Sequence, residues 1–118
     1  MAVKLKQAFA QPAAADGYRV LVDRLWPRGL VKAKAKVDEW PRSIAPSEDL
    51  LRLFHGDQIS WKEFRRRYLS ELRLNRELLR PLAKKSVQGQ VTLIYAAKDE
   101  EYNNAVVLQQ YLEMLVTD

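Results

Sequence analysis

The sequence contains no cysteine and only one histidine among its 118 residues. Without cysteine there is no disulfide, no thiol nucleophile and no thiolate ligand for a metal. One histidine without a cluster of carboxylates leaves a transition-metal site short of ligands, so we expect no metal. The lack of cysteine also fits a reducing compartment, and we expect a cytoplasmic protein.

Long apolar runs and glycine-rich loops are missing as well. No run approaches the ~20 apolar residues of a membrane helix, so we expect no membrane association. The first 17 residues alternate charged and apolar side chains and lack the apolar centre of a signal peptide. Nothing resembles a P-loop or a dinucleotide-binding fingerprint, and we therefore expect no cofactor.

Positive charge is in excess, with 20 Lys and Arg against 15 Asp and Glu, a net charge of +5 and a pI of about 9.6. This balance favours acidic partners such as nucleic acid, phosphorylated metabolites or an acidic protein. A charge of this size is also common on small domains for solubility alone. The length suits a single domain over residues 1–118.

Three segments are typical of β-strands. Residues 2–9 alternate apolar and charged side chains, as an edge strand does. Residues 18–25 and 91–98 have continuous apolar centres, which favour strands covered on both faces. A long helical segment separates these two, so we expect them to be adjacent and parallel. The predicted fold is α/β: a small sheet with a parallel central strand pair, flanked by helices on both faces.

Two serines mark helix starts. Ser47 precedes a helix over residues 48–54, and Ser60 with Glu63 forms a capping box before the next one. Gly56 is expected to end the first helix in the left-handed conformation. A further helix is predicted within residues 76–85, and Asp99 is the expected cap of the last one.

The second of these helices should have a buried stripe and a charged outer face. The stripe has helical spacing and comprises Trp61, Phe64, Tyr68 and Leu72. Residues four apart, Glu63 with Arg67 and Arg67 with Glu71, are expected to pair outside. Before these helices, residues 26–46 contain three prolines and predict a long connection with a short helix at most.

Polar residues follow both buried strands, and the carboxyl ends of parallel strands are where ligands bind. Pro27 and Gly29 would stiffen the turn that carries Arg28, and arginine forks bind carboxylate or phosphate. Asp23 is expected to orient one of these guanidinium groups. The sequence therefore predicts a cleft for a small anionic ligand, with binding residues Arg24, Trp26, Arg28, Lys98 and Asn104. Trp26 also fits a purely structural place in the core.

Asp23 and His55 are the candidate catalytic residues, as a general acid and base. The structural alternatives are that Asp23 pairs with Arg24 or Arg28, and that His55 only caps helix carbonyls. Asn104 is expected on the buried side of the last helix, with Asn103 near its polar edge. The residues leave open whether the protein is an enzyme.

A binding module for nucleic acid or a protein partner is the alternative function. The three consecutive arginines at 65–67 diverge on a helix, and only Arg66 joins Lys62 and Arg73 on one flank. Such a flank could follow phosphates, but no aromatic side chains alternate with it as stacking platforms. A small anion is therefore the favoured partner. The sequence specifies neither the ligand's identity nor the oligomeric state.

Five stretches together carry a family resemblance: VDRLWPRGLVKAK, DEWPRSIAPSEDL, FHGD, SWKEFRRRYLSEL and VTLIYAAKDEEYNNAVVL. With them the chain resembles the domain-of-unknown-function family 488 (DUF488), in its short YeaO-like branch. The resemblance covers residues 17–112 and implies a compact α/β protein. The family pattern falls on Asp23, Arg24, Trp26, Pro27, Arg28, Gly29, Trp40, Pro46, Ser47, His55, Lys98, Asp99 and Asn104.

Longer members of that family carry Cys and His near the positions of Asn103 and Asn104. This chain lacks both residues there. The resemblance therefore implies a fold and a site location, and it transfers no thiol or metal chemistry.

Overall fold

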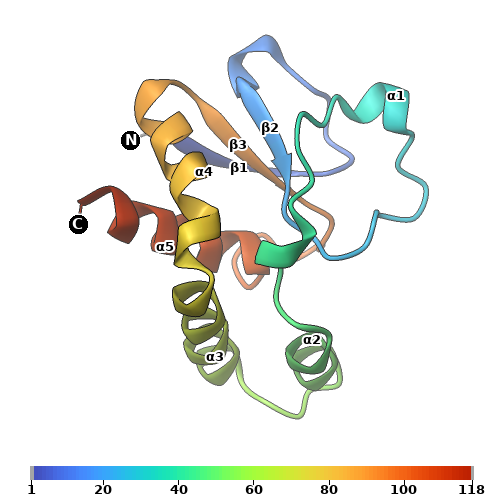
Figure 1. Cartoon of the computed structure of the whole chain (residues 1–118). Helices are drawn as coiled ribbons and strands as arrows, with labels where there is room; N and C mark the ends of the chain where they lie inside the picture. The colour runs from blue at the N-terminus through green and yellow to red at the C-terminus, as the bar shows by residue number, and fades with distance from the viewer. Residues whose placement is uncertain (1, 118) are drawn as a thin grey trace.

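The computed structural model describes residues 2–117, which form a three-stranded parallel sheet beside five helices (Figure 1). The strands are β1 (Val3–Gln7), β2 (Tyr18–Leu21) and β3 (Val91–Tyr95), in the order β1-β3-β2. Leu93 in the central strand lies opposite Leu5 on one side and Val20 on the other. The predicted adjacency and parallel direction of the two buried strands are confirmed.

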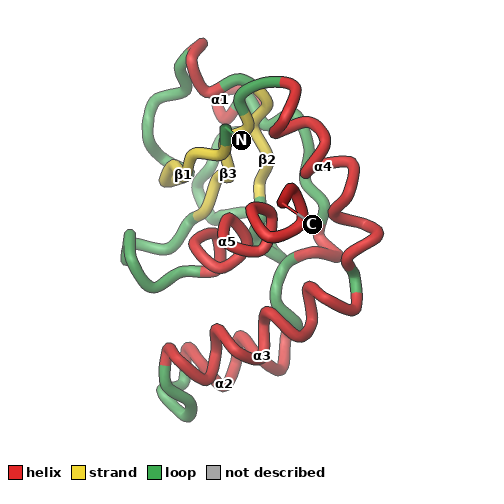
Figure 2. Tube along the Cα trace, turned by 90° about the vertical axis from the view of Figure 1, so that its left-hand side faces the viewer, coloured by secondary structure: helices red, strands yellow, loops and turns green. Residues whose placement is uncertain are grey.

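The helices follow the predicted order. They are α1 (Lys32–Ala35), α2 (Glu48–His55), α3 (Trp61–Leu74), α4 (Arg76–Gln88) and α5 (Asn104–Thr117). Short 3-10 turns occur at Ala14–Asp16 and Arg42–Ile44. Figure 2 shows α5 lying between the sheet and α3. Among residues 2–117, no helix has the length and apolar character needed to span a membrane.

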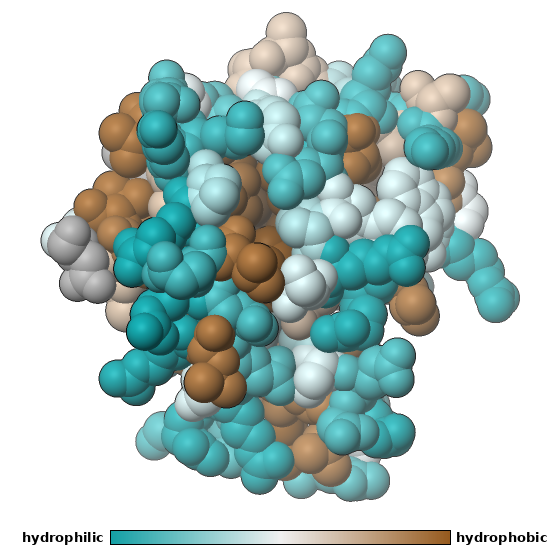
Figure 3. Space-filling view, viewed as in Figure 1, coloured by the Kyte–Doolittle hydropathy of each residue, from teal (hydrophilic) through white to brown (hydrophobic). Residues whose placement is uncertain are grey.

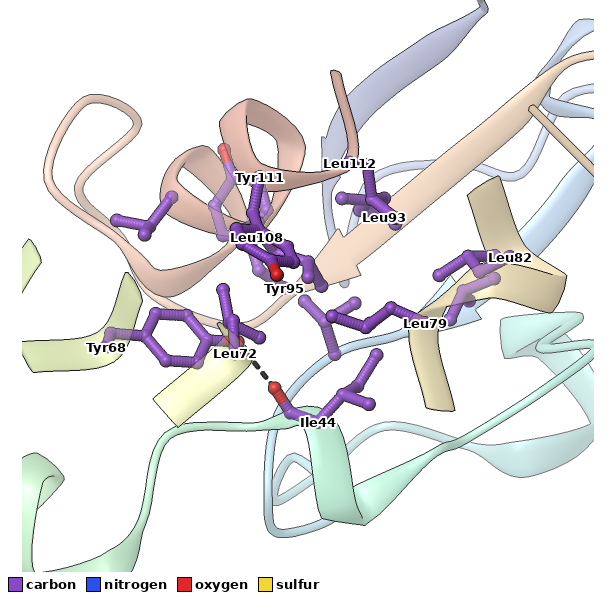
Figure 4. Close-up of a cluster of buried hydrophobic side chains, with 14 of the residues drawn as sticks. Ile44, Tyr68, Leu72, Leu79, Leu82, Leu93, Tyr95, Leu108, Tyr111 and Leu112 are labelled. Carbon is purple, nitrogen blue, oxygen red and sulfur yellow. Dashed lines mark hydrogen bonds between the residues drawn. The ribbon is translucent and has the colours of Figure 1, made fainter. Parts of the chain in front are cut away.

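One face of the sheet is packed against the long helices. Alternate strand residues, including Val20, Val91 and Leu93, are completely buried there with Leu108 of α5. The cluster in Figure 4 continues through α3, where the Tyr68 hydroxyl donates a hydrogen bond to the Ile44 carbonyl oxygen at 2.6 Å. This face forms the larger part of the core.

The other face is covered by the connection between β2 and α2. Leu21 and Ile94 are completely buried against Trp26 and Trp40, whose rings meet edge to face at 5.5 Å. The connection contains α1, and its residues 38–39 also lie along the outer edge of β2. Both sheet faces are therefore covered, although the long helices gather on one of them.

The helix starts agree with the serine caps. The Ser47 hydroxyl accepts from the Leu50 N–H at 3.2 Å, and the Ser60 hydroxyl accepts from the Glu63 N–H at 3.1 Å. The predicted ion pair between Arg67 and Glu63 is present, but the one predicted between Arg67 and Glu71 is wrong. The Glu71 carboxylate instead accepts from the backbone N–H and the hydroxyl of Ser47, which ties the start of α2 to α3.

Gly56 ends α2 as predicted, but its expected left-handed conformation and the expected cap of α5 are wrong. Gly56 has φ −86°, and the left-handed residue is Asp57 with φ +58°. Asp99 does not cap α5, because its carboxylate accepts from the N–H groups of Glu101 and Tyr102 and so closes a turn in the preceding loop. The cap is Asn103, whose side-chain oxygen accepts from the Val106 N–H at 3.1 Å.

The surface is mostly hydrophilic on the face drawn in Figure 3, where hydrophobic atoms emerge as separate patches. One such patch lies beside the C-terminal end of α5. The net charge of +5 is therefore displayed on a surface with few continuous apolar areas on this side.

Candidate functional site

The carboxyl ends of β2 and β3 meet at Asp23. Its Oδ2 accepts from the Ala96 N–H at 3.0 Å, and its Oδ1 accepts from Asn104 Nδ2 at 3.4 Å. The same Asn104 amide donates to the Val22 carbonyl oxygen at 3.0 Å. Asp23 and Asn104 therefore do come together, as the sequence predicted, and they tie two strands to the start of α5.

Burial raises the pKa of Asp23, because its carboxylate has lost much of its water. The Ala96 N–H, the Asn104 amide and the positive charge of His55 act against this shift. The side chain of His55 is exposed beside Phe54. Both oxygens of Asp23 already accept hydrogen bonds, so the carboxylate is held in place.

Arg24 supports the chain that leads into α2. Its Nε donates to the Pro46 carbonyl oxygen at 2.9 Å, and its Nη2 donates to the Ala45 carbonyl oxygen at 3.4 Å. Within residues 2–117, Asp23 forms no ion pair with Arg24 or Arg28. The expectation that Asp23 orients a guanidinium group is wrong, because Asp23 binds the β3 backbone instead.

The turn that carries Arg28 is built as the sequence predicted. The Leu30 N–H donates to the Pro27 carbonyl oxygen at 3.1 Å, and Gly29 has φ +85°, as the third position of a type II turn requires. Trp26 Nε1 donates to the Leu30 carbonyl oxygen at 2.8 Å and fixes the turn to the core. Arg28 itself is exposed, and in the described part of the chain it has no hydrogen bond or ion pair.

The two asparagines exchange their expected environments. Asn103 is only 3% exposed, and its Nδ2 donates to the Asp99 carbonyl oxygen at 2.8 Å. Asn104 is partly exposed and faces Asp23. The helix begins at Asn104, later than expected, so Asn103 is its cap and a helical wheel does not describe where its side chain lies. Lys98 is exposed in the loop after β3.

A groove of about 560 Å³ lies where β1 ends, between the segment after β1 and the connection after β2. Its only charged lining residues are lysines. The full lining is Ala8, Phe9, Ala10, Gln11, Pro12, Gly29, Leu30, Val31, Ala33, Lys34, Ala35 and Lys36. The groove starts at the carboxyl end of β1 and extends to α1, which Arg19, the second residue of β2, holds against the sheet face.

A buried ion network holds one wall of this groove. Asp16 and Arg19 are 3% and 4% exposed, and their side chains pair at 2.6 Å. Arg19 also donates from Nη2 to the Ala35 carbonyl oxygen at 2.8 Å and from Nε to the Lys36 carbonyl oxygen at 3.1 Å. Lys6 contacts the same carboxylate at 3.1 Å. The network thereby docks α1 onto the sheet.

The sequence contained a signal for this groove that the predictions above did not use. Residues 24–37 hold five cations and no acid, and the remaining chain carries 15 cations against 15 acids. Residues 24–37, which contain one groove wall and the adjacent turn, therefore carry a net charge of +5, and the rest of the chain is balanced. The five cations are Arg24, Arg28, Lys32, Lys34 and Lys36.

In the predicted basic flank of α3, Arg66 forms an ion pair, whereas within residues 2–117 Lys62 and Arg73 form none. Arg66 and Arg67 both pair with Glu63 at 2.6 Å, and their hydrogen bonds lower the pKa of Glu63 to about 2. Arg65 does not reach the carboxyl edge, because its Nε donates to Gln110 of α5 at 2.8 Å. Lys62 is exposed beside them.

The sequence is similar to several uncharacterized bacterial proteins. It is 39% identical to the uncharacterized protein YeaO of Escherichia coli (strain K12) over 115 residues, which cover 98% of this chain and 100% of that protein. It is also 39% identical over 99 residues to the uncharacterized proteins Mb3100c of Mycobacterium bovis and Rv3073c of Mycobacterium tuberculosis, covering 82% of this chain and 81% of each relative.

No solved structure matches the chain. A family model described as the inactive DUF488-N3 subclade matches residues 2–118. This match and the identity to YeaO agree with the family resemblance that the sequence shows in the motif after β2 and at the helix starts. The chain therefore belongs to the DUF488 family, in the subclade described as inactive, and is YeaO-like.

Proposed function

We propose that this protein binds a small anionic ligand without transforming it, in the groove between the segment after β1 and the connection after β2. Arg28 and the lysines Lys34 and Lys36 would receive the negative charge. The observation that carries this proposal is the concentration of the entire net charge in residues 24–37, which contain groove-lining residues and no acid.

The availability of these cations supports the proposal. Arg24 is engaged with backbone carbonyls, whereas Arg28 is exposed on a turn that Trp26 holds in place. A guanidinium group on a fixed turn loses little freedom when it binds a carboxylate or phosphate. Lys34 and Lys36 stand on α1 and at its end, and Arg19 anchors that segment.

The state of the candidate catalytic pair favours binding over catalysis. Both Asp23 oxygens accept hydrogen bonds from the protein, so the carboxylate is occupied by the fold. His55 is exposed at the end of α2. The description of the matched subclade as inactive agrees with a role that involves no reaction.

Nucleic-acid binding through α3 is less well supported. Glu63 pairs with Arg66 of that flank and with the neighbouring Arg67, which reduces the positive field available to phosphates there. The groove has no such acidic lining residue.

Charge reversal tests the proposed site. Arg28→Glu should weaken the binding of inorganic phosphate about ten-fold or more, since a charge-assisted hydrogen bond contributes roughly 1.5–3 kcal/mol. Lys62→Glu on α3 is the matched control, because it makes the same change in net charge at an exposed position outside the groove. The measurement is the rise in melting temperature with phosphate concentration in low-salt buffer.

The two variants separate specific binding from the general effect of phosphate on stability, which acts equally on both. Arg28→Lys should fall between the parent and Arg28→Glu, because it keeps the charge and loses the fork. Equal phosphate responses of Arg28→Glu and Lys62→Glu would refute the site. A larger loss in Lys62→Glu would favour the α3 flank.

A further inference from the structure

We infer that the ligand is an amphiphilic organic anion, whose apolar part lies on the groove and whose carboxylate or phosphate meets the surrounding cations. This inference rests on the proposed anion site and adds the chemical class of the molecule. It excludes a bare inorganic anion and a nucleic-acid backbone as the preferred ligand.

The first observation is the apolar surface that the groove leaves in water. Phe9 and Val31 line it from opposite segments, and their side chains are 55% and 54% exposed. Pro12 and Leu30 add further apolar surface to the same lining. Apolar side chains that share a hollow of this kind mark a binding site more often than scattered surface residues do.

The second observation is the shape of the floor. Ala8 and Ala35 are 2% and 3% exposed at its base, and Ala10 and Ala33 complete a lining of small side chains. Small residues leave room for a ligand and offer it only methyl groups and backbone. A volume of about 560 Å³ falls within the range of small-molecule sites, which are mostly apolar with a few polar groups that fix orientation.

The third observation is the charge arrangement. Lys34 and Lys36 line the groove, and Arg28 precedes the lining residue Gly29. An apolar floor with cations at its margin complements a molecule that has an apolar body and one anionic end. Two other hollows differ from the groove in the charges that line them. The hollow on α3, of about 340 Å³, includes the acidic residue Glu63. The hollow between α4 and α5, of about 330 Å³, includes Arg80, which pairs with Glu77.

A series of alkyl phosphates tests the inference. Inorganic phosphate, methyl phosphate, butyl phosphate and hexyl phosphate would be titrated at monomeric concentrations, with hexanol as the uncharged comparison. Each buried methylene contributes about 0.8 kcal/mol, so affinity should rise up to about four-fold for each carbon that enters the groove. Trp26 fluorescence should report binding, because the indole N–H donates a hydrogen bond to the carbonyl oxygen of Leu30, which lines the groove.

Two substitutions locate the effect. Phe9→Gln with Val31→Gln should flatten the rise in affinity with chain length, because both changes remove apolar surface from the groove. Leu74→Gln is the matched control, since Leu74 is 84% exposed at the end of α3 and does not line the groove. Hexanol should bind far more weakly than hexyl phosphate, because it lacks the charge.

The outcomes separate this inference from the function on which it rests. Equal affinity for inorganic and hexyl phosphate, with a loss in Arg28→Glu, would overturn the amphiphilic ligand and leave the anion site intact. A chain-length effect unchanged in the double variant would also overturn it. Binding only to anionic vesicles, with none to monomeric hexyl phosphate, would overturn it in favour of a lipid surface. No binding of any member would end both proposals.

Discussion

Single residues of the same type serve different purposes at the carboxyl edge. Arg24 and Arg28 stand four positions apart, yet Arg24 donates to two backbone carbonyls and Arg28 points into solvent. Sequence reasoning grouped them because both follow a buried strand. Their separation could not be predicted, since the partners of Arg24 lie at Ala45 and Pro46, more than 20 residues away along the chain.

Gly29 provides a prediction at this scale. Its φ of +85° is unfavourable for any residue with a Cβ, although a Cβ there would meet no neighbouring atom. Gly29→Ala should therefore reduce the free energy of unfolding by about 1–2 kcal/mol through backbone strain alone. It should also weaken phosphate binding, because the turn that presents Arg28 would relax.

Gly89→Ala is the control for that substitution. Gly89 has φ −173°, which is extended backbone open to any residue, and its Cβ would likewise meet nothing. Urea unfolding should show a stability equal to or above that of the parent, since alanine restricts the unfolded chain. Similar losses in both variants would mean that the turn does not require glycine.

Elements were predictable where local patterns specify them. The two buried strands, the serine caps and the order of helices all followed from residues close together in the chain. The prediction that Asp99 caps α5 was wrong, because a carboxylate can close a loop turn as well as cap a helix. The docking of α1 was not foreseen, because it depends on Arg19 reaching Ala35 and Lys36 across the sheet face.

The network that docks α1 predicts a pH effect. Burial alone would raise the pKa of Asp16, but hydrogen bonds from the Ala13 N–H, Lys6 and Arg19 outweigh it and hold the pKa below its ordinary value of 3.8. A lowered pKa means that the charged carboxylate stabilises the fold. This stabilisation is complete above the ordinary pKa and is lost as the pH falls through the lower, folded-state value.

Asp16→Asn should therefore lower the free energy of unfolding by about 3–5 kcal/mol at neutral pH, since it leaves Arg19 buried without its counter-charge. Its stability should also fall less steeply than that of the parent as acid is added below about pH 4. Glu63→Gln is the comparison, because Glu63 also binds two guanidinium groups but lies at the surface. Chemical unfolding at several pH values measures the stability of both variants. Equal losses in the free energy of unfolding would contradict the structural role of Asp16.

At the scale of the whole molecule, charge and topology point to the same place. The groove runs from the carboxyl end of β1 to α1, and residues 24–37, several of which line it, carry five cations and no acid. The sequence predicts a binding site at the carboxyl edge of the sheet, and this location stays a prediction. It did not reveal that the hollow lies beside β1, because nothing local to Ala8–Pro12 indicates which segment it will face.

The most direct test is to map phosphate binding onto the backbone by NMR, titrating methyl phosphate into isotopically labelled protein. Amide shifts are predicted in residues 8–11 and 28–36, together with the Nε–H of Arg28 and the indole N–H of Trp26. Arg28→Glu should abolish them, and the amides of residues 60–69 on α3 should stay unchanged. Shifts confined to α3, or saturable binding with no response at residues 28–36, would contradict the account.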